Sequence, residues 1–337
     1  MKVSVVCPIY NEERFIARCI ESVVAQDYPK EELELFFVDG MSNDATRSIV
    51  ADYASKYPFL HLLDNPHKTV PYALNAGIKD STGDIIIRID GHCTYPVNYI
   101  STLVEWQVKL QADNVGAVWN TLPARDTTVC HAIAAASSHK FGVGNSLHKV
   151  GADKVTETDT VPFGCFPRSV FERIGLFDTD LVRNQDDEFN ARIINAGGKI
   201  FLIPKLVIDY YARDSVKKMM KMYYQYGLFK PLVNKKLGAP ATVRQFFPML
   251  FVLGIVLGGL MSLAWSWPQI PYLAVLLLYA LLAVAFSVQE AGRRHKPLLV
   301  LVLPLMFLLV HLSYGWGYLV GIYKLLTHGK FAVEINR

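Results

Sequence analysis

The first ninety residues alternate short apolar runs with segments whose apolar positions recur at helical spacing. Apolar runs at Lys2–Pro8, Leu33–Val38 and Phe59–Leu63 predict strands. The repeat from Phe15 to Val24 and the stretch Pro71–Lys79 predict helices between them. Successive strand–helix units favour an α/β fold whose central sheet is mostly parallel and covered by helices.

The next apolar run, within residues 81–92, ends abruptly in Asp90-Gly91-His92. Polar groups at the carboxyl end of a strand lie where open α/β folds keep their ligand crevice. Asp90 and His92 are two residues apart, so on an extended segment they would face the same side and could share one cation. The alternative is a tight glycine turn with solvated polar ends.

The last third of the chain has a different pattern. Phe246–Trp267 has 22 residues without a charge, Ile270–Val288 has 19, and Leu298–Tyr323 has 26 with His311 as its only ionisable group. About 20 apolar residues span a bilayer, so we expect three transmembrane helices. A re-entrant last segment, kinked near Pro304 or broken at Gly315 and Gly317, is the alternative, because three crossings would put Lys324, Lys330 and Arg337 outside.

Charge divides the chain in the same way. Residues 1–212 carry 20 Lys and Arg against 27 Asp and Glu, a net charge of 20 − 27 = −7. Residues 213–244 carry eight basic residues and one acid, for 8 − 1 = +7. Within them Val216–Lys230 sets lysines against Met, Tyr and Phe, which predicts a helix at the lipid interface, with packing on the soluble domain as the alternative. We therefore expect a cytoplasmic domain at 1–212, a basic interfacial segment at 213–244 and a membrane domain at 245–337.

The five cysteines all precede the apolar segments and form no Cys-x-x-Cys pair, which favours reduced thiols in the cytoplasm over disulfides or zinc. No signal peptide is recognisable before the first strand. A Rossmann dehydrogenase would need a glycine-rich turn after that strand, but the turn reads Cys7-Pro8-Ile9-Tyr10-Asn11-Glu12. Neither a G-x-G-x-x-G motif nor a P-loop occurs, and nothing calls for a nucleic-acid partner.

Four motifs together resemble the ordered signature of family 2 glycosyltransferases. They are Pro8-Ile9-Tyr10-Asn11-Glu12, Asp39-Gly40-Met41-Ser42-Asn43-Asp44, Gly83-Asp84 leading to Asp90-Gly91-His92, and Gln185-Asp186-Asp187-Glu188-Phe189 with Arg192. With the apolar tail, the chain is most similar to membrane-anchored bacterial exopolysaccharide glucosyltransferases of the succinoglycan (ExoA-like) type. The resemblance implies a nucleotide-sugar-binding domain of the GT-A fold over about the first 210 residues.

The resemblance also implies roles for residues of the donor site. Pro8, Tyr10, Glu12 and Asp39 would line the nucleobase pocket, with the Asp39 carboxylate accepting the uracil N3–H. Further donor contacts would come from Asp84, Asp90, Gly164 and Arg168. For Asp84 a plain turn role is an equal alternative, and for Arg168 a surface ion pair is.

The same resemblance implies a divalent cation on Asp90 and His92 that neutralises charge on the departing nucleoside diphosphate. A nitrogen ligand favours Mn²⁺, with Mg²⁺ as the alternative. Asp186 would be the catalytic base of an inverting reaction. Acids at a helix start also complement the helix dipole, which is the alternative explanation for Asp186, Asp187 and Glu188. Arg192, Arg213 and Gln225 would contact acceptor or diphosphate.

The sequence therefore predicts non-processive transfer of a hexose, with glucose favoured by resemblance, from a UDP-sugar to a polyprenyl-diphosphate-linked saccharide. A polyprenyl-phosphate hexosyltransferase is the main alternative, and a non-catalytic membrane-tethered protein the third. No tryptophan lies between Trp119 and Trp265, so the Gln-x-x-Arg-Trp element of processive synthases is absent. In Leu122–Asp159 the residues His131, His139 and His148 have no metal-like spacing and are expected to be structural or solvated, and the alternative for this stretch is a mobile loop that contacts acceptor or closes on donor. The oligomeric state stays open.

Overall fold

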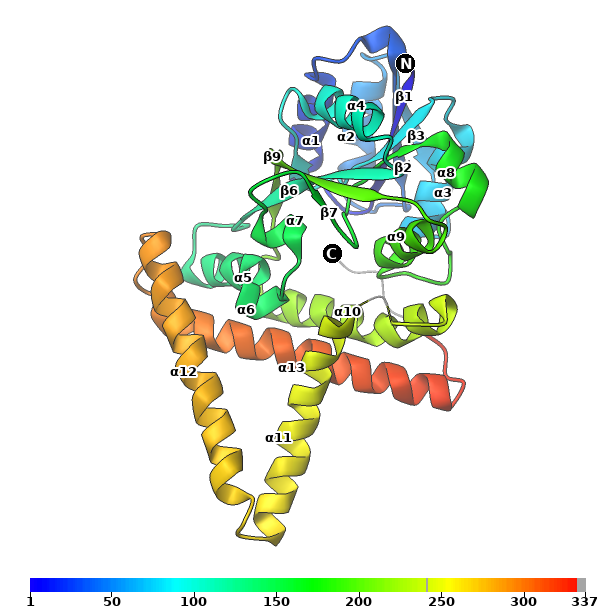
Figure 1. Cartoon of the computed structure of the whole chain (residues 1–337). Coiled ribbons are helices and arrows are strands. Elements are labelled where there is room, and N and C mark those ends of the chain that lie inside the picture. Colours follow the sequence, from blue (N-terminus) through cyan, green and yellow to red (C-terminus); the bar gives the residue numbers. More distant parts are fainter. Residues whose placement is uncertain (241, 332–337) are drawn as a thin grey trace. The chain divides into compact units, whose positions relative to one another are not determined.

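The computed structural model describes residues 1–240 and 242–331, and these form two compact units. The first comprises Met1–Asn120 and Val150–Tyr210, and the second comprises Thr121–Lys149 and residues 211–331. The units are not consecutive along the chain, since 121–149 belongs with the apolar helices rather than with the residues on either side of it. Figure 1 gives the element labels used below.

The first half of the central sheet is parallel. Its strands are β1 (Val3–Ile9), β2 (Leu33–Asp39), β3 (Leu60–Asp64) and β4 (Ile85–Arg88), and β1 pairs with both β2 and β4. Helices α1 (Ile16–Val24), α2 (Thr46–Ala54) and α3 (Val70–Asp80) connect them, with the short 3₁₀ helix Lys30–Glu32 before β2. These elements confirm the strand–helix alternation predicted from the sequence.

The second half of the sheet is antiparallel. Strand β8 (Cys165–Pro167) pairs with β4, and β6 (Asn114–Leu122) pairs with β8. Strand β9 (Ile200–Tyr211) pairs with the short strands β5 (Cys93–Thr94) and β7 (Thr156–Glu157), and the order along the sheet is β3-β2-β1-β4-β8-β6-β9-β5. The sheet is therefore mixed rather than mostly parallel, since β8, β5 and β7 each pair antiparallel with a neighbouring strand.

Alternate residues of the central strands build two layers. Val5 and Cys7 share a core with Ile16 and Ile20 of α1 and with α4 (Tyr99–Leu110). On the other face Gly77 of α3 lies directly on the Val6 side chain, where a Cβ would collide. Helices α8 (Arg168–Ile174) and α9 (Gln185–Asn195) complete this unit. The five cysteines are buried and free, which agrees with reduced thiols.

The second unit is helical. Its long members are α10 (Val216–Leu237), α11 (Phe247–Ala264), α12 (Gln269–Arg293) and α13 (Leu299–Leu326), with the 3₁₀ helix Val243–Phe246 leading into α11. Helices α11 to α13 are long and apolar enough to cross a membrane, as the sequence predicts. Helix α13 is continuous through Pro304, Gly315 and Gly317, so the alternative of a break at these glycines is wrong.

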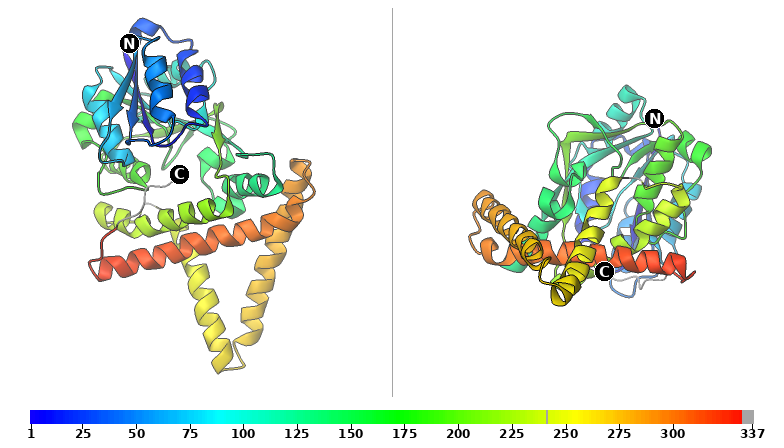
Figure 2. Two further views of the ribbon diagram at one scale, coloured as in Figure 1. Left: turned by 180° about the vertical axis from the view of Figure 1, so that it is seen from behind. Right: turned by 60° about the horizontal axis from the view of Figure 1, so that its bottom comes forward.

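Helices α10 and α13 lie side by side, while α11 and α12 project from them as a hairpin (Figures 1 and 2). Glycines allow the backbones to meet: a Cβ at Gly317 would collide with the Tyr224 carbonyl, and one at Gly321 with that of Leu228. The apolar face of α10, including Met219 and Phe229, is therefore buried. This face is covered by α13 and neighbouring helices, and the position of α10 at the lipid interface stays a prediction.

The segment Leu122–Asp159, for which the sequence left a mobile loop open, is largely helical. It contains α5 (Thr128–Ser138), α6 (Lys140–Val143) and α7 (Leu147–Val150). Ala132–Ala136 are fully buried in one core with α10 and α13. Small residues suggested a loop, but alanine has the highest helix propensity and fits where helices pack closely.

Candidate functional site

The turns after β1 and β2 interlock at the carboxyl edge of the sheet. Asp39, the last residue of β2, is fully buried and accepts hydrogen bonds from the Ser42 amide (3.1 Å) and the Ser42 hydroxyl (2.5 Å). The Arg47 guanidinium lies 3.3 Å from Asp39 and 2.6 Å from Asp64. In the β1 turn the Asn11 amide donates to the Ser42 hydroxyl (2.9 Å). A buried polar cluster thus forms at neighbouring strand ends.

The remaining nucleobase candidates lie in or beside this turn. Pro8 is buried in β1, and Tyr10, the first residue after the strand, is partly exposed. The Glu12 side chain is 4% exposed, and its backbone amide donates to the Thr46 hydroxyl (2.6 Å) at the start of α2. The fold brings these residues together with Asp39, and their contact with a nucleobase stays a prediction.

At the end of β4, one arginine joins two acidic motifs distant in sequence. The Arg88 guanidinium contacts the Asp186 carboxylate through one nitrogen and lies 3.4 Å from the Asp90 carboxylate through another. Arg88 is 6% exposed, whereas Asp90 and Asp186 keep 21% and 25% exposure, so both carboxylates reach solvent beside a buried cation. The buried Tyr95 hydroxyl accepts from the Asp90 amide (2.9 Å) and fixes the backbone there.

The electrostatics of this cluster follow from its burial. Burial raises the pKa of the Asp186 carboxyl above its ordinary value, although Arg88 acts in the opposite direction. Burial opposes the charge on Arg88, but the carboxylates of Asp186 and Asp90 outweigh it and raise the pKa of Arg88. Asp186 is therefore a carboxylate whose basicity is increased by burial and whose ionised form depends on Arg88.

Asp186, Asp187 and Glu188 occupy the first turn of α9, where acids complement the helix dipole. Asp186 contacts Arg88. The Asp187 carboxylate lies 3.4 Å from the Thr160 hydroxyl, and Glu188 pairs with Arg192 at 2.6 Å. The three acids thus differ in surroundings, which is compatible with both explanations given for them by the sequence.

His92 lies differently from the prediction. Strand β4 ends at Arg88, and Gly91 and His92 form a turn, so the premise of an extended segment is not met. The His92 imidazole is 6% exposed, lies 3.8 Å from the Glu12 carboxylate and packs edge-on against the Tyr210 ring at 5.1 Å. Its surroundings are those of a ring held by a carboxylate and an aromatic wall.

The donor set tests whether a divalent cation fits. Among the described residues no group of three His, Cys, Asp or Glu side chains could hold a metal. Asp90 offers one part-exposed carboxylate, and Mg²⁺-type sites often use one or two carboxylates with substrate phosphates supplying other ligands. The residues therefore fit a cation shared with a diphosphate through Asp90, and they do not form a cation cage made by protein alone.

An aromatic stack lines the sheet beside this cluster. The Trp119 ring stacks on Tyr210 at 4.3 Å and on Phe163 at 5.0 Å, and the Arg88 guanidinium lies 5.3 Å from the Phe163 ring centre. Gly164 follows Phe163, and its carbonyl accepts from the Arg88 amide (2.9 Å). A Cβ at Gly164 would collide with Asn114 and Phe166, so this position requires glycine for close packing.

Three other candidates are engaged in structural contacts. Arg168 donates to the Gly83 carbonyl (2.6 Å) and the Ser81 carbonyl (3.0 Å), and Asp84 accepts from the Lys2 amide (3.1 Å). These contacts lie at the amino end of β4, opposite Asp90. Arg192 donates to the Ile174 and Leu176 carbonyls in addition to Glu188.

Asp84 thus has a contact compatible with the turn role that the sequence left open, whereas Arg168 forms hydrogen bonds to backbone carbonyls and the Ser81 hydroxyl rather than the surface ion pair given as its alternative. Arg192 has a structural role, and the contact of these three residues with substrate stays a prediction. Arg213 and Gln225 belong to the second unit, where Gln225 is buried in α10. Their contact with an acceptor stays a prediction.

Sequence reasoning missed Arg88 and the stack of Trp119 on Tyr210. A signal for Arg88 was present, because a single arginine stands within the apolar run from Ile85 to Ile89. A charged residue inside a buried strand needs a partner of opposite charge, but the sequence does not show which carboxylate that partner is.

The fold is that of the GT-A class. The Glycosyl transferase family 2 sequence profile matches residues 4–174, and the chain belongs to this family and is a glycosyltransferase.

Two relatives are similar over most of the chain. A Methanococcus voltae protein, dolichyl N-acetyl-alpha-D-glucosaminyl phosphate 3-beta-D-2,3-diacetamido-2,3-dideoxy-beta-D-glucuronosyltransferase, is 27% identical over 333 residues, covering 96% of this chain and 97% of that protein. The succinoglycan biosynthesis protein ExoA of Rhizobium meliloti is 30% identical over 262 residues, covering 77% of this chain and 78% of that protein. The family thus includes relatives that act on lipid-linked sugars.

One solved structure supports the fold. The mannosyltransferase PcManGT from Pyrobaculum calidifontis, in complex with GDP-Man and Mn²⁺, superposes with a TM-score of 0.61 at 21% identity. The match covers 94% of this chain and 87% of that one. It confirms the GT-A-like mixed sheet.

Proposed function

We propose that this protein transfers a hexose, with inversion and with a divalent cation, from a UDP-sugar to a polyprenyl-diphosphate-linked saccharide at the cytoplasmic face of the plasma membrane. Glucose is the proposed hexose, because the resemblance to succinoglycan-type transferases favours it. The product would belong to exopolysaccharide or another cell-surface glycan.

The observation that carries this proposal is the contact of Arg88 with both Asp90 and Asp186. The resemblance to family 2 glycosyltransferases implies that Asp90 serves the donor diphosphate and Asp186 the acceptor hydroxyl, and a transferase must bring both substrates to one place. A non-catalytic protein that only binds the donor would need Asp90 but not Asp186. Their convergence on one cation therefore favours an enzyme.

Each group in the site has a proposed task. Asp186 accepts the proton of the acceptor hydroxyl as that oxygen attacks the anomeric carbon from the face opposite the leaving group. Arg88 holds Asp186 ionised and oriented, and Asp39 accepts the uracil N3–H in the buried polar cluster at the strand ends. A divalent cation on Asp90 would neutralise charge on the departing diphosphate, with Mn²⁺ preferred and Mg²⁺ the alternative.

The proposed acceptor rests on the relatives and on the second unit. The Methanococcus voltae relative is named for a dolichyl phosphate-linked sugar acceptor, and it matches this chain almost end to end. Three helices suited to a membrane would be unnecessary for a transferase of soluble sugars. A lipid-linked saccharide is therefore preferred over a bare polyprenyl phosphate, which stays the alternative.

A panel assay tests donor and acceptor together. Purified protein in liposomes, with Mn²⁺ and radiolabelled UDP-glucose, UDP-galactose, UDP-N-acetylglucosamine or GDP-mannose, is offered polyprenyl-diphosphate-linked saccharide, polyprenyl phosphate or free oligosaccharide. We expect label from UDP-glucose only in the lipid-linked saccharide, and a β-linkage by NMR.

Asp186→Asn is the matched control that separates enzymatic transfer from contamination. Label in polyprenyl phosphate would establish the alternative function. Label in free oligosaccharide at the same efficiency would contradict a lipid acceptor, and an α-linkage would contradict inversion.

A further inference from the structure

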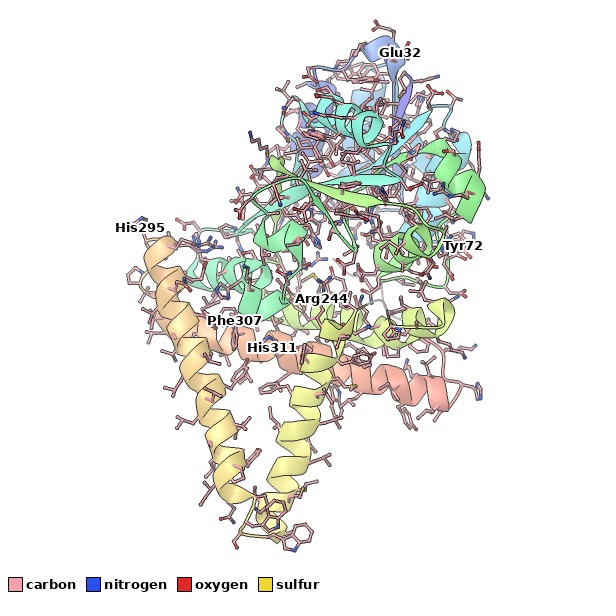
Figure 3. The ribbon with its side chains drawn as sticks, viewed as in Figure 1. Glu32, Tyr72, Arg244, His295, Phe307 and His311 are labelled. Atoms are coloured by element: carbon pink, nitrogen blue, oxygen red, sulfur yellow. The ribbon has the colours of Figure 1, made fainter. Side chains whose placement is uncertain are left out.

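The third apolar helix, α13, has a covered face along most of its length. Its N-terminal half packs on α5 and α6, where Ala132–Ala136 meet Leu303 and Phe307 in one core. The His311 imidazole then lies 2.8 Å from the Phe141 carbonyl of α6. Figure 3 labels Phe307 and His311 on this helix.

The C-terminal half of α13 packs on α10. Gly317 and Gly321 lie against the Tyr224 and Leu228 carbonyls, and the Asn234 amide donates to the Tyr318 hydroxyl (2.9 Å). Before the helix begins, the Lys296 ammonium lies 3.1 Å from the Asp126 carboxylate, just ahead of α5.

Neither α5 nor α10 can follow α13 through a bilayer. Helix α5 has 11 residues, about 17 Å at 1.5 Å per residue, which is too short to span a hydrocarbon core of about 30 Å. Helix α10 carries six lysines: Lys217, Lys218, Lys221, Lys230, Lys235 and Lys236. Lysines inside the hydrocarbon core are costly, and these six are spread along the whole length of the helix, so α10 stays at the surface.

The opposite face of α13 is apolar and exposed. It carries Leu301 (77% exposed), Leu305 (52%), Trp316 (55%) and Tyr323 (66%), which recur at spacings that place them on one stripe. Helices α11 and α12 also expose apolar side chains, but their most apolar stretches are 6% and 11% buried, compared with 39% for α13. Among these three helices, α13 thus has a face covered by protein opposite a face suited to lipid.

We infer that α13 lies in the plane of the membrane surface beside α10, and that only the α11–α12 hairpin crosses the bilayer. The occupant of the exposed stripe is the lipid surface itself. Helix α13 has 28 residues, about 42 Å at 1.5 Å per residue. Its two halves pack on α5 and α10, neither of which crosses the bilayer. Trp265 and Trp267, at the hairpin tip, reach the far interface, where tryptophan is favoured.

This topology places the C-terminal end of α13 on the cytoplasmic side. Lys324 and Lys330 then share a side with Arg293, Arg294 and Lys296, as the positive-inside rule requires. Three crossings would separate these two basic groups. The inference concerns the membrane topology and is independent of the proposed reaction.

Cysteine accessibility in intact cells tests it, since the five native cysteines are buried. Single variants Ser266→Cys, Lys296→Cys and Thr327→Cys are treated with a membrane-impermeant maleimide, with Glu31→Cys as the cytoplasmic reference. All four positions are exposed, and each variant must react fully in detergent. We expect only Ser266→Cys to react in intact cells. Reaction of Thr327→Cys would overturn the in-plane helix, and protection of Ser266→Cys would overturn the crossing hairpin.

Depth measurements test the in-plane helix directly. Spin labels at Leu301→Cys, Trp316→Cys and Tyr323→Cys, in protein reconstituted in liposomes, report depth from collisions with oxygen and a nickel complex. An in-plane helix gives one similar depth, about 5–10 Å below the headgroups, at all three sites. A spanning helix would instead put Trp316→Cys deeper than both others, near the middle of a core about 30 Å thick, and would refute the inference.

Discussion

Replacing Arg88 with methionine should slow transfer, because it removes the cation that keeps Asp186 ionised. Methionine keeps an unbranched apolar stem in the buried space and loses both carboxylate contacts. Two unit charges about 4 Å apart interact by about 4 kcal/mol at an effective dielectric constant of 20. Asp186 keeps 25% exposure, so solvent reduces this energy, and about 2 kcal/mol is a reasonable expectation. At 1.36 kcal/mol per factor of ten, turnover near neutral pH should fall about 10- to 100-fold.

The pH dependence of turnover separates this effect from simple destabilisation. Burial already raises the pKa of Asp186 and Arg88 opposes the rise, so without Arg88 the pKa increases further. A base acts when deprotonated, so the acidic limb of the kcat profile should move to higher pH and the deficit should shrink in alkaline buffer.

Arg168→Met is the matched control for Arg88→Met. Arg168 binds only uncharged partners, the Gly83 and Ser81 groups at the other end of β4. Its loss should lower stability and leave the pH profile in place. An unmoved profile in Arg88→Met, or an equal movement in Arg168→Met, would refute the role given to Arg88.

Three further predictions concern the acids. Asp186→Asn should retain nucleotide affinity and lose about 10²- to 10⁴-fold in kcat, while Asp187→Asn, beside Thr160, should lose far less. A larger loss in Asp187→Asn would show that Asp187, and not Asp186, is the catalytic base. Chelation should abolish transfer and Mn²⁺ should restore it, whereas Asp90→Ala should stay folded by circular dichroism and inactive with Mn²⁺; full turnover in excess chelator would exclude the cation. Burial raises the pKa of Glu34, but hydrogen bonds from Lys2, Thr82 and Ser4 outweigh it and lower the pKa to about 2. Glu34 should therefore stabilise the fold above about pH 4.5 and lose this as pH falls toward 2, so Glu34→Gln should lower the free energy of unfolding by about 1–3 kcal/mol at pH 7 and by less in acid; a constant deficit across pH would contradict this.

Local pattern predicted the parallel half of the sheet because each strand there is a short apolar run followed by an amphipathic helix. Leu33–Val38 is observed as Leu33–Asp39, and Pro71–Lys79 as Val70–Asp80. The antiparallel strands β5, β7 and β8 escaped prediction because they have two or three residues each, too few for a period to show. Helix α5 escaped because its apolar residues are small, and its role is visible only beside α13.

In the candidate site, too, some residues could be predicted from local pattern and others could not. Strand-end motifs gave Asp39 and Asp90, since the carboxyl ends of parallel strands share one edge. The turn of His92 toward Glu12 and the ion pair between Arg88 and Asp186 depend on how distant segments meet, which no spacing in the sequence encodes. The bonds of Arg168 to backbone carbonyls depend on the same tertiary arrangement.

The burial of Ala132–Ala136 has a consequence for biosynthesis. These residues emerge early, yet the side chains that cover them, on α10 and α13, are translated roughly 85 to 175 residues later. Until then the apolar face of α5 is open to water, so a chain ending after residue 212 would display it permanently. Such a truncation should aggregate or associate with membranes although it contains every proposed catalytic residue, and co-expression of the missing helices should restore a membrane-bound active pair only if they can still reach α5.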